Sequence, residues 1–259
     1  MCLIAWNWQP GESHELLLIA NRDEFHARPT APAQVWDGGH ILAGKDLQGG
    51  GTWLGLSRSG RFAALTNHRN PGAARVGPPT RGQLVTGFLN STLSGPDYLA
   101  HVAADAPLYN PFNLLLFDGR QLLGFESRHG RTLAMQAGLG AVSNADFHSP
   151  WPKIVTLQAR LGQCVKERST ANHTLLSLLT DKSVACDAQL PATGLPMERE
   201  RALSAVYIDT PGYGTRASSI VRLDRHRAEL VEVCLDAAGM ASTCSGSFLL
   251  RSGQPIALV

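Results

Sequence analysis

A cysteine at position 2 and a run of four polar residues at 21–24 are the groups in this sequence best suited to chemistry. Removal of the initiator methionine, which is usual before a small residue, would make Cys2 the N-terminus and give it a free α-amine. An ordinary thiol has a pKa near ~8.5, and an α-amine with a pKa of roughly 8 is a base of matching strength. We therefore expect Cys2 to be a nucleophile whose own amine takes the thiol proton.

The segment from Asn21 to Glu24 supplies complementary groups. Arg22 can favour the thiolate, and the carboxylate of Asp23 or Glu24 can orient the amine or the thiol. On a strand, Asn21 and Asp23 lie on one face and Arg22 and Glu24 on the other, so all four reach one site only if the strand ends or bulges. The competing interpretation is that Cys2 is a small buried apolar residue and that the segment is a hairpin exit with a local ion pair.

Two apolar segments must position these groups. Residues 1–8 and 16–25 have the composition of strands, and the turn residues at 9–13 predict that they pair as an antiparallel hairpin. Such a hairpin returns the polar segment to the side of Cys2. The nucleophile and its partners are thus expected to lie together.

The rest of the chain alternates between groups of strands and groups of helices. Strand patterns occupy residues 52–56, 61–67, 113–117, 121–126, 139–144, 202–209, 217–223, 228–234 and 247–250. Helical spacing occurs at 96–104, 152–168, 172–180 and from about Thr80, which we expect to be an N-cap. Residues 26–51 predict short strands or an irregular loop. This order favours a single α+β domain spanning residues 1–259 over a doubly wound sheet.

Composition excludes several classes of function. A net charge of +2 over 259 residues provides no strong field for nucleic acid or an anionic membrane. No apolar run approaches the ~20 residues of a membrane span, and no secretory signal is recognisable, so we expect a cytoplasmic protein. Five cysteines without a Cys-x-x-Cys pair argue against a disulfide framework and a structural zinc site, and no metal site is predicted.

Several motifs, in this order, resemble the NRDE family, which includes the transport and Golgi organisation group. They are Met-Cys-x-Ile at 1–4, Ala-Asn-Arg-Asp-Glu-Phe at 20–25 with Arg-Pro at 28–29, Gly-Gly-Thr-Trp-Leu-Gly at 50–55, Ala-Leu-Thr-Asn at 64–67 and Pro-Gly-Tyr-Gly-Thr-Arg at 211–216. The resemblance runs nearly end to end. It implies the fold of N-terminal-nucleophile hydrolases, which is a four-layer αββα sandwich. Within that superfamily, the resemblance implies that the cysteine amidases are the nearer relatives.

The resemblance also implies a catalytic set, which comprises Cys2, Arg22, Asp23, Asn67, Asn144 and Arg216. Relatives carry an Arg-x-x-Asp spacing, whereas Arg22 and Asp23 are adjacent here, so both Asp23 and Glu24 remain candidates for the site carboxylate. Asn67 and Asn144 follow expected strands, where neutral N–H donors can face a developing oxyanion. The late arginine is expected to favour the thiolate or to hold an anionic substrate.

Four further residues are expected to contact the substrate: Asn21, Glu24, Trp53 and His68. Two functions remain open. The first is hydrolysis of a linear amide through a thioester on Cys2, with a small-molecule amide as substrate. The second is non-enzymatic carriage of haem or a hydrophobic, lipid-related metabolite in the same cleft. Because no Cys-x-x-Cys-His motif is present, haem would bind non-covalently, and no other cofactor is expected.

Overall fold

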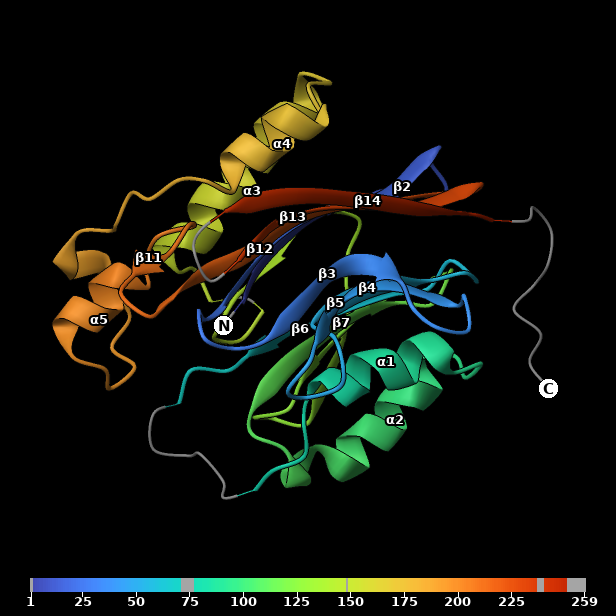
Figure 1. Cartoon of the computed structure of the whole chain (residues 1–259), viewed down its shortest axis with the longest axis horizontal. Coiled ribbons are helices and arrows are strands. Elements are labelled where there is room, and N and C mark those ends of the chain that lie inside the picture. The colour runs from blue at the N-terminus through green and yellow to red at the C-terminus, as the bar shows by residue number, and fades with distance from the viewer. Residues whose placement is uncertain (1, 71–76, 148, 237–239, 251–259) are drawn as a thin grey trace.

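The structure is a computed structural model that describes residues 2–70, 77–147, 149–236 and 240–250. Two antiparallel sheets lie face to face between two layers of helices (Figure 1). The first sheet has the strand order β10-β1-β2-β12-β13-β14, with β11 paired to β12, and the second runs from β3 to β9 in chain order. The four-layer αββα arrangement expected from the resemblance is confirmed.

The first sheet contains β1 (Cys2–Trp8), β2 (His14–Phe25), β10 (Gly138–Val142), β11 (Asp209–Thr210), β12 (Tyr213–Asp224), β13 (Arg227–Leu235) and β14 (Ala241–Leu249). The second contains β3 (Thr30–Val35), β4 (Ile41–Asp46), β5 (Leu54–Ser57), β6 (Phe62–Asn67), β7 (Phe112–Phe117), β8 (Leu122–Glu126) and β9 (Arg131–Ala134). The expected β1–β2 hairpin is present, and its register places Cys2 opposite Arg22.

Helices cover the outer face of each sheet (Figure 1). One layer comprises α1 (Gly82–Asn90), α2 (Gly95–Asp105) and the short 3-10 helix Ala106–Leu108. The other contains α3 (Pro152–Lys166) and α4 (Asn172–Leu178), followed by the 3-10 helix Asp187–Gln189 and α5 (Met197–Ala202). No helix in the described ranges has the length and apolarity needed to cross a membrane.

Alternation along β1 explains why this strand is buried on both faces. Ile4 and Trp6 join the core between the two sheets, whereas Leu3 packs with Leu157 and Leu161 of α3 in the outer core. Fully burying a leucine contributes about 1.5–3 kcal/mol to stability. The strand that begins with Cys2 is therefore held from both sides.

Two predictions about local structure need correction. The N-cap of α1 is Arg81, not Thr80, and its side chain makes no capping hydrogen bond. The strand expected at 202–209 is wrong, because residue 202 ends α5 and only Asp209 and Thr210 pair with β12. The apolar residues there, such as Val206, pack under the outer layer, and burial without strand pairing produced the misleading pattern. Strand β9 had no counterpart among the predictions.

Candidate active site

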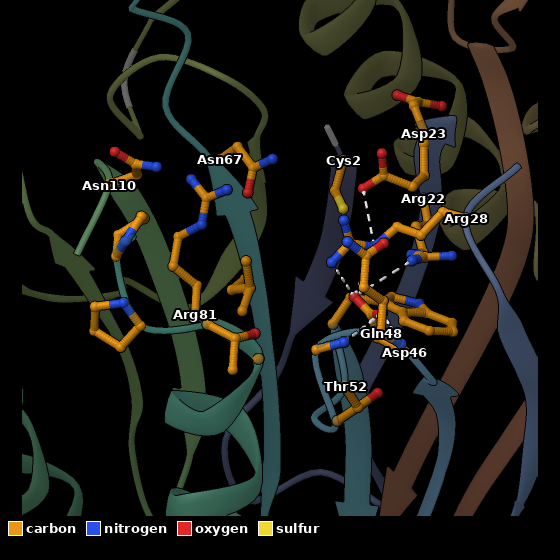
Figure 2. A pocket seen from close by; sticks show the side chains of 18 residues that line it. Cys2, Arg22, Asp23, Arg28, Asp46, Gln48, Thr52, Asn67, Arg81 and Asn110 are labelled. Carbon is orange, nitrogen blue, oxygen red and sulfur yellow. Dashed lines mark hydrogen bonds and ion pairs between the residues drawn. The ribbon is translucent and has the colours of Figure 1, made fainter. Parts of the chain in front are cut away.

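Cys2 begins β1 at one end of the first sheet and faces a cavity of about 460 Å³ (Figure 2). Directly opposite residues of an antiparallel pair share a face, so the side chains of Cys2 and Arg22 point the same way, into the space between the sheets. The charged residues that line the cavity are Arg22, Asp23, Glu24, Arg28, Asp46 and Arg81. The expected meeting of thiol, guanidinium and carboxylate is therefore found in the structure.

Two arginines beside Cys2, Arg22 and Arg28, are held by a carboxylate that the sequence interpretation missed, that of Asp46. Asp46, at the end of β4, accepts hydrogen bonds from Arg28 Nε at 2.9 Å and Nη2 at 2.8 Å. Its Oδ2 lies 3.9 Å from Arg22 Nη2, and the Arg22 guanidinium carbon lies 4.2 Å from the ring centroid of Trp53. Burial works against ionisation of Asp46, but the hydrogen bonds from Arg28 and the Gly49 backbone, together with the charges of Arg28 and Arg22, outweigh it and lower the pKa of Asp46. These contacts and the 2.9 Å hydrogen bond from Arg22 Nη1 to Thr30 Oγ1 fix Arg22 in front of the thiol.

The environment of Cys2 favours the protonated form of the thiol. Burial raises the pKa of Cys2, and the charge of Arg22 opposes this effect without overcoming it. Asp23 and Glu24 raise the pKa of the thiol further. A nucleophilic role for Cys2 thus requires a nearby base, because Arg22 alone does not produce the thiolate.

Asp23 lies at the level where the chain enters β1. This follows from the register of the two antiparallel strands, in which Cys2 pairs with Arg22 and Asp23 is the next residue of β2. Thr215 Oγ1 donates a hydrogen bond of 2.8 Å to Asp23 Oδ1, and Tyr213 Oη donates one of 3.2 Å to its backbone oxygen. Burial raises the pKa of Asp23.

The strand irregularity required for both faces of β2 to contribute is found in its partner strand. The pairing of β12 with β2 shifts register between Thr215 and Ala217, opposite the polar segment. Because they lie at this irregular end of β2, three consecutive residues line the cavity: Arg22, Asp23 and Glu24. Of the two candidate carboxylates, Glu24 is the more exposed.

Asn67 ends β6 on the cavity wall across from Cys2 (Figure 2). Within the described ranges its carboxamide makes no hydrogen bond, so its N–H donors are available to a ligand. Asn144 is fully buried instead and donates a 2.9 Å hydrogen bond to the backbone oxygen of Asn67. Ser143, which we did not anticipate, donates from Oγ to the backbone oxygen of Cys2 at 2.9 Å. Asn144 thus braces the site without lining it.

Arg216 does not line the Cys2 cavity. Its Nη1 donates to the backbone oxygens of His26 at 2.7 Å and Phe25 at 3.0 Å, and its Nε donates to that of Leu235 at 3.0 Å. Arg216 occupies the register shift in β12, and its side chain is directed to the turn after β2. It holds the backbone near the site, whereas we had expected it at the thiol or the substrate.

Two of the four residues expected to contact the substrate do not line this cavity. Asn21 faces the outer layer, where its Nδ2 donates to the backbone oxygens of Leu179 at 2.8 Å and Val206 at 2.9 Å. His68 does not line the cavity; its Nε2 lies 3.5 Å from Asp146 Oδ1, and burial lowers its pKa. Glu24 and Trp53 do line the cavity, as expected.

Arg81, which the sequence interpretation also missed, projects from the wall across from Cys2 (Figure 2). Its Nη1 donates to the backbone oxygen of Pro111 at 3.1 Å, and burial lowers its pKa. No carboxylate among the described residues lies within ion-pair distance of Arg81. Nor do three His, Cys, Asp or Glu side chains gather as metal ligands anywhere in those residues.

An αββα sandwich with a cysteine at the head of a central strand, facing a charged cavity, defines a scaffold of the N-terminal-nucleophile hydrolase type. The sequence family Transport and Golgi organisation 2 matches residues 1–236. The chain belongs to this family.

Similar proteins carry the same family description. The human Transport and Golgi organization protein 2 homolog is 34% identical over 252 residues, and the bovine one is 32% identical over 246; each alignment covers 86% of this chain and 89% of the relative. The Drosophila melanogaster protein is 28% identical over 261 residues, covering 86% and 88%. Among solved structures, the Caenorhabditis elegans N-acylethanolamine-hydrolyzing acid amidase ortholog matches with a TM-score of 0.47 and 11% identity, covering 85% of this chain and 92% of that chain.

Proposed function

We propose that this chain is an N-terminal-nucleophile amidohydrolase that cleaves a linear C–N bond through a thioester on Cys2. The observation that supports this most is the register of β1 and β2, which places Cys2 opposite Arg22 and brings Cys2, Arg22 and Asp23 to the lining of one cavity. The proposal requires removal of Met1, which lies outside the described residues. The five free thiols suit a reducing compartment, so we place the enzyme in the cytoplasm.

The reaction follows from these groups. The α-amine of Cys2 takes the thiol proton, and the thiolate attacks the amide carbon to form a C–S bond while the carbonyl oxygen gains negative charge. Collapse of this intermediate breaks the C–N bond, and the ammonium returns its proton to the leaving amine. Water, deprotonated by the same amine, then attacks the thioester carbon and releases the acid and the thiol.

Asn67 and Asp23 have distinct roles in this scheme. The Asn67 carboxamide, across the cavity and available to a ligand, donates to the oxyanion, and such a donor lowers the barrier by about 3 kcal/mol. Asp23 orients the amine and raises its basicity. Glu24 is not given the role of orienting the amine, because its carboxylate already has other partners. Its Oε2 lies 3.8 Å from Arg28 Nε, and its Oε1 accepts a hydrogen bond from the backbone nitrogen of Phe25.

The cavities suggest the substrate class. A second cavity of about 590 Å³ shares Glu24 and Asn67 with the first and has Leu195, Leu203 and Tyr213 in its wall. An apolar acyl group fits there, while Arg81 in the first cavity would bind a carboxylate on the amine side. We therefore propose amides that join an apolar acyl group to a carboxylate-bearing amine.

Hydrolysis of a panel of N-acyl amino acids by purified protein lacking Met1 tests this function. Wild type and the control Cys186→Ala, which removes an exposed thiol, are expected to release the amine at equal rates. Cys2→Ala is expected to release none. Equal hydrolysis by wild type and Cys2→Ala would contradict the proposal.

Carriage of an apolar metabolite is the second candidate, and the cavity beside Tyr213 favours it. Neither cavity contains histidine or methionine in its described lining, so these residues do not fit a haem ligated in that way. A carrier would bind the metabolite unchanged and would retain binding in Cys2→Ala. Calorimetry with an N-acyl amino acid, followed by mass analysis of the recovered ligand, separates an intact ligand from a hydrolysed one.

A further inference from the structure

A third cavity lies at the edge of the sandwich, apart from Cys2. It has a volume of about 560 Å³ and is formed where residues 135–137 join β9 to β10, the edge strands of the two sheets, beside the start of α3. It shares no lining residue with the two cavities near Cys2. Its size lies within the range of sites that enclose small molecules, which is about 300–1,000 Å³.

Trp6 brings an unused hydrogen-bond donor to this cavity. It lines the cavity and is 3% exposed, and its indole N–H donates to no acceptor among the described residues. The Nε1 atom of Trp8, on the same face of β1, is also unpaired but is inaccessible to solvent, whereas that of Trp6 is accessible. A buried indole N–H usually has a hydrogen-bond partner, so the cavity is the place from which Trp6 can receive one.

The indole of Trp6 is held in position by its neighbours. Trp6 pairs with Gly140 of β10, and a Cβ atom on Gly140 would lie 2.2 Å from Trp6 Cζ2 and 2.8 Å from its Nε1. The indole therefore lies against the backbone of β10, where glycine leaves room for it. Phe147 packs against the same ring edge to face, with the ring centroids 6.2 Å apart. A donor held in place before binding loses little entropy when a ligand arrives.

The lining of the cavity indicates the charge of its ligand. No described residue in the lining has an ionisable side chain, and its walls include Leu133, Met135 and Ile154. An ionised ligand would lose its hydration there without gaining a counter-charge, which is costly. A neutral ligand with an apolar body meets no such cost.

We propose that this cavity binds a neutral, apolar molecule that carries a carbonyl or hydroxyl oxygen, and that this oxygen accepts a hydrogen bond from Trp6 Nε1. The site is separate from the thiol, because Trp6 is four residues after Cys2 on β1, or roughly 13 Å along the strand. The inference does not depend on the proposed function, since no step of it uses Cys2.

The test is a titration followed by NMR on protein labelled with ¹⁵N at the indole nitrogens, with 2-decanone as the probe. The indole signals of Trp6 and Trp8 are assigned by their loss in Trp6→Phe and Trp8→Phe. We expect 2-decanone to shift the Trp6 signal downfield to saturation and to leave the Trp8 signal in place. Decanoate, which is ionised at about pH 7.5, is expected to bind here at least about tenfold more weakly.

The variants isolate the hydrogen bond. Trp6→Phe keeps an aromatic ring and removes the N–H, so we expect the affinity for 2-decanone to fall about three- to tenfold. The affinity is read from the methyl signal of Met135, which lines the same cavity and is present in every variant. Trp8→Phe is the matched control, because it removes an indole N–H from the same face of β1 outside the cavity. Trp8→Phe and Cys2→Ala are both expected to bind as wild type does.

Three results would overturn the inference. They are a Trp6 indole signal that does not move at saturating 2-decanone, a decanoate affinity equal to that for 2-decanone, and an unchanged affinity in Trp6→Phe. Should Trp6→Phe not fold, intermolecular nuclear Overhauser effects in wild type decide instead. Contacts from 2-decanone to both an indole proton and the Met135 methyl group support the site, and their absence overturns it.

Discussion

Ser143 Oγ donates a hydrogen bond of 2.9 Å to the backbone oxygen of Cys2. This contact joins the end of β10 to the start of β1, and Ser143 is fully buried. It fixes the first residue of β1 from the side of β10. The position of the thiol therefore depends on a residue 141 positions away in the sequence.

Replacing Ser143 by alanine should loosen Cys2. We expect a loss of about 1 kcal/mol in unfolding free energy and a slower alkylation of the thiol, because its backbone loses one anchor. Ser219→Ala is a matched control, since Ser219 is also buried and donates to Glu232 at 3.1 Å, away from the cavity. Both variants should lose similar stability by urea unfolding. A Cys2 rate that falls equally in both would count against the anchoring role.

Replacing each of the two asparagines by alanine should affect a different quantity, kcat for Asn67 and stability for Asn144. Asn67→Ala removes a donor that faces the cavity, so we expect kcat to fall by about 10²–10³ with little change in stability. Asn144→Ala leaves the partly buried backbone oxygen of Asn67 without this partner, at a cost of about 1–3 kcal/mol. Kinetics and urea unfolding on both variants check this. The assignment fails if Asn67→Ala leaves kcat unchanged.

Asp46 should make stability depend on pH. Its pKa is lowered in the folded state, so its contribution is complete above the unfolded pKa of about 3.9 and is lost as pH falls through the lower, folded value. We expect Asp46→Asn to be less stable than wild type at pH 7, by a difference that shrinks as pH falls below about 3.9. The exposed Asp37→Asn is the control and should differ from wild type by less than about 0.5 kcal/mol. A pH-independent difference for Asp46→Asn would contradict the ion-pair role.

Arg81 should select the substrate. In Arg81→Ala we expect KM for a carboxylate-bearing amide to rise at least about tenfold, while KM for the matching neutral amide changes little. Arg81→Lys keeps the charge but not the planar group and should be intermediate. The exposed Arg120→Ala is the control. Equal effects on both amides would remove Arg81 from substrate recognition.

Local patterns were sufficient for the elements that carry the nucleophile. Turn residues and apolar runs predicted the β1–β2 hairpin, and therefore the approach of Cys2 to Arg22. Helical spacing located α1 to α4 to within a few residues, while the layering of the two sheets came from the family resemblance.

The rest depended on contacts between distant segments. Asp46 ends a short strand in a region whose sequence resembles a loop, so it carries no sequence signal for the site. Arg216 belongs to a matching motif, but the register shift beside it turns its side chain to backbone oxygens. A bulge in a partner strand cannot be read from alternation along one strand.

The central claim is that Cys2, freed of Met1, forms a thioester during turnover. The most direct measurement is intact mass and peptide mapping after rapid acid quenching of a reaction with an activated acyl amide. The account predicts a chain that lacks methionine and carries one acyl group on the N-terminal cysteine, lost on longer incubation and absent in Cys2→Ala. A chain that retains Met1, or one that hydrolyses the amide with the acyl group on another residue, would contradict it.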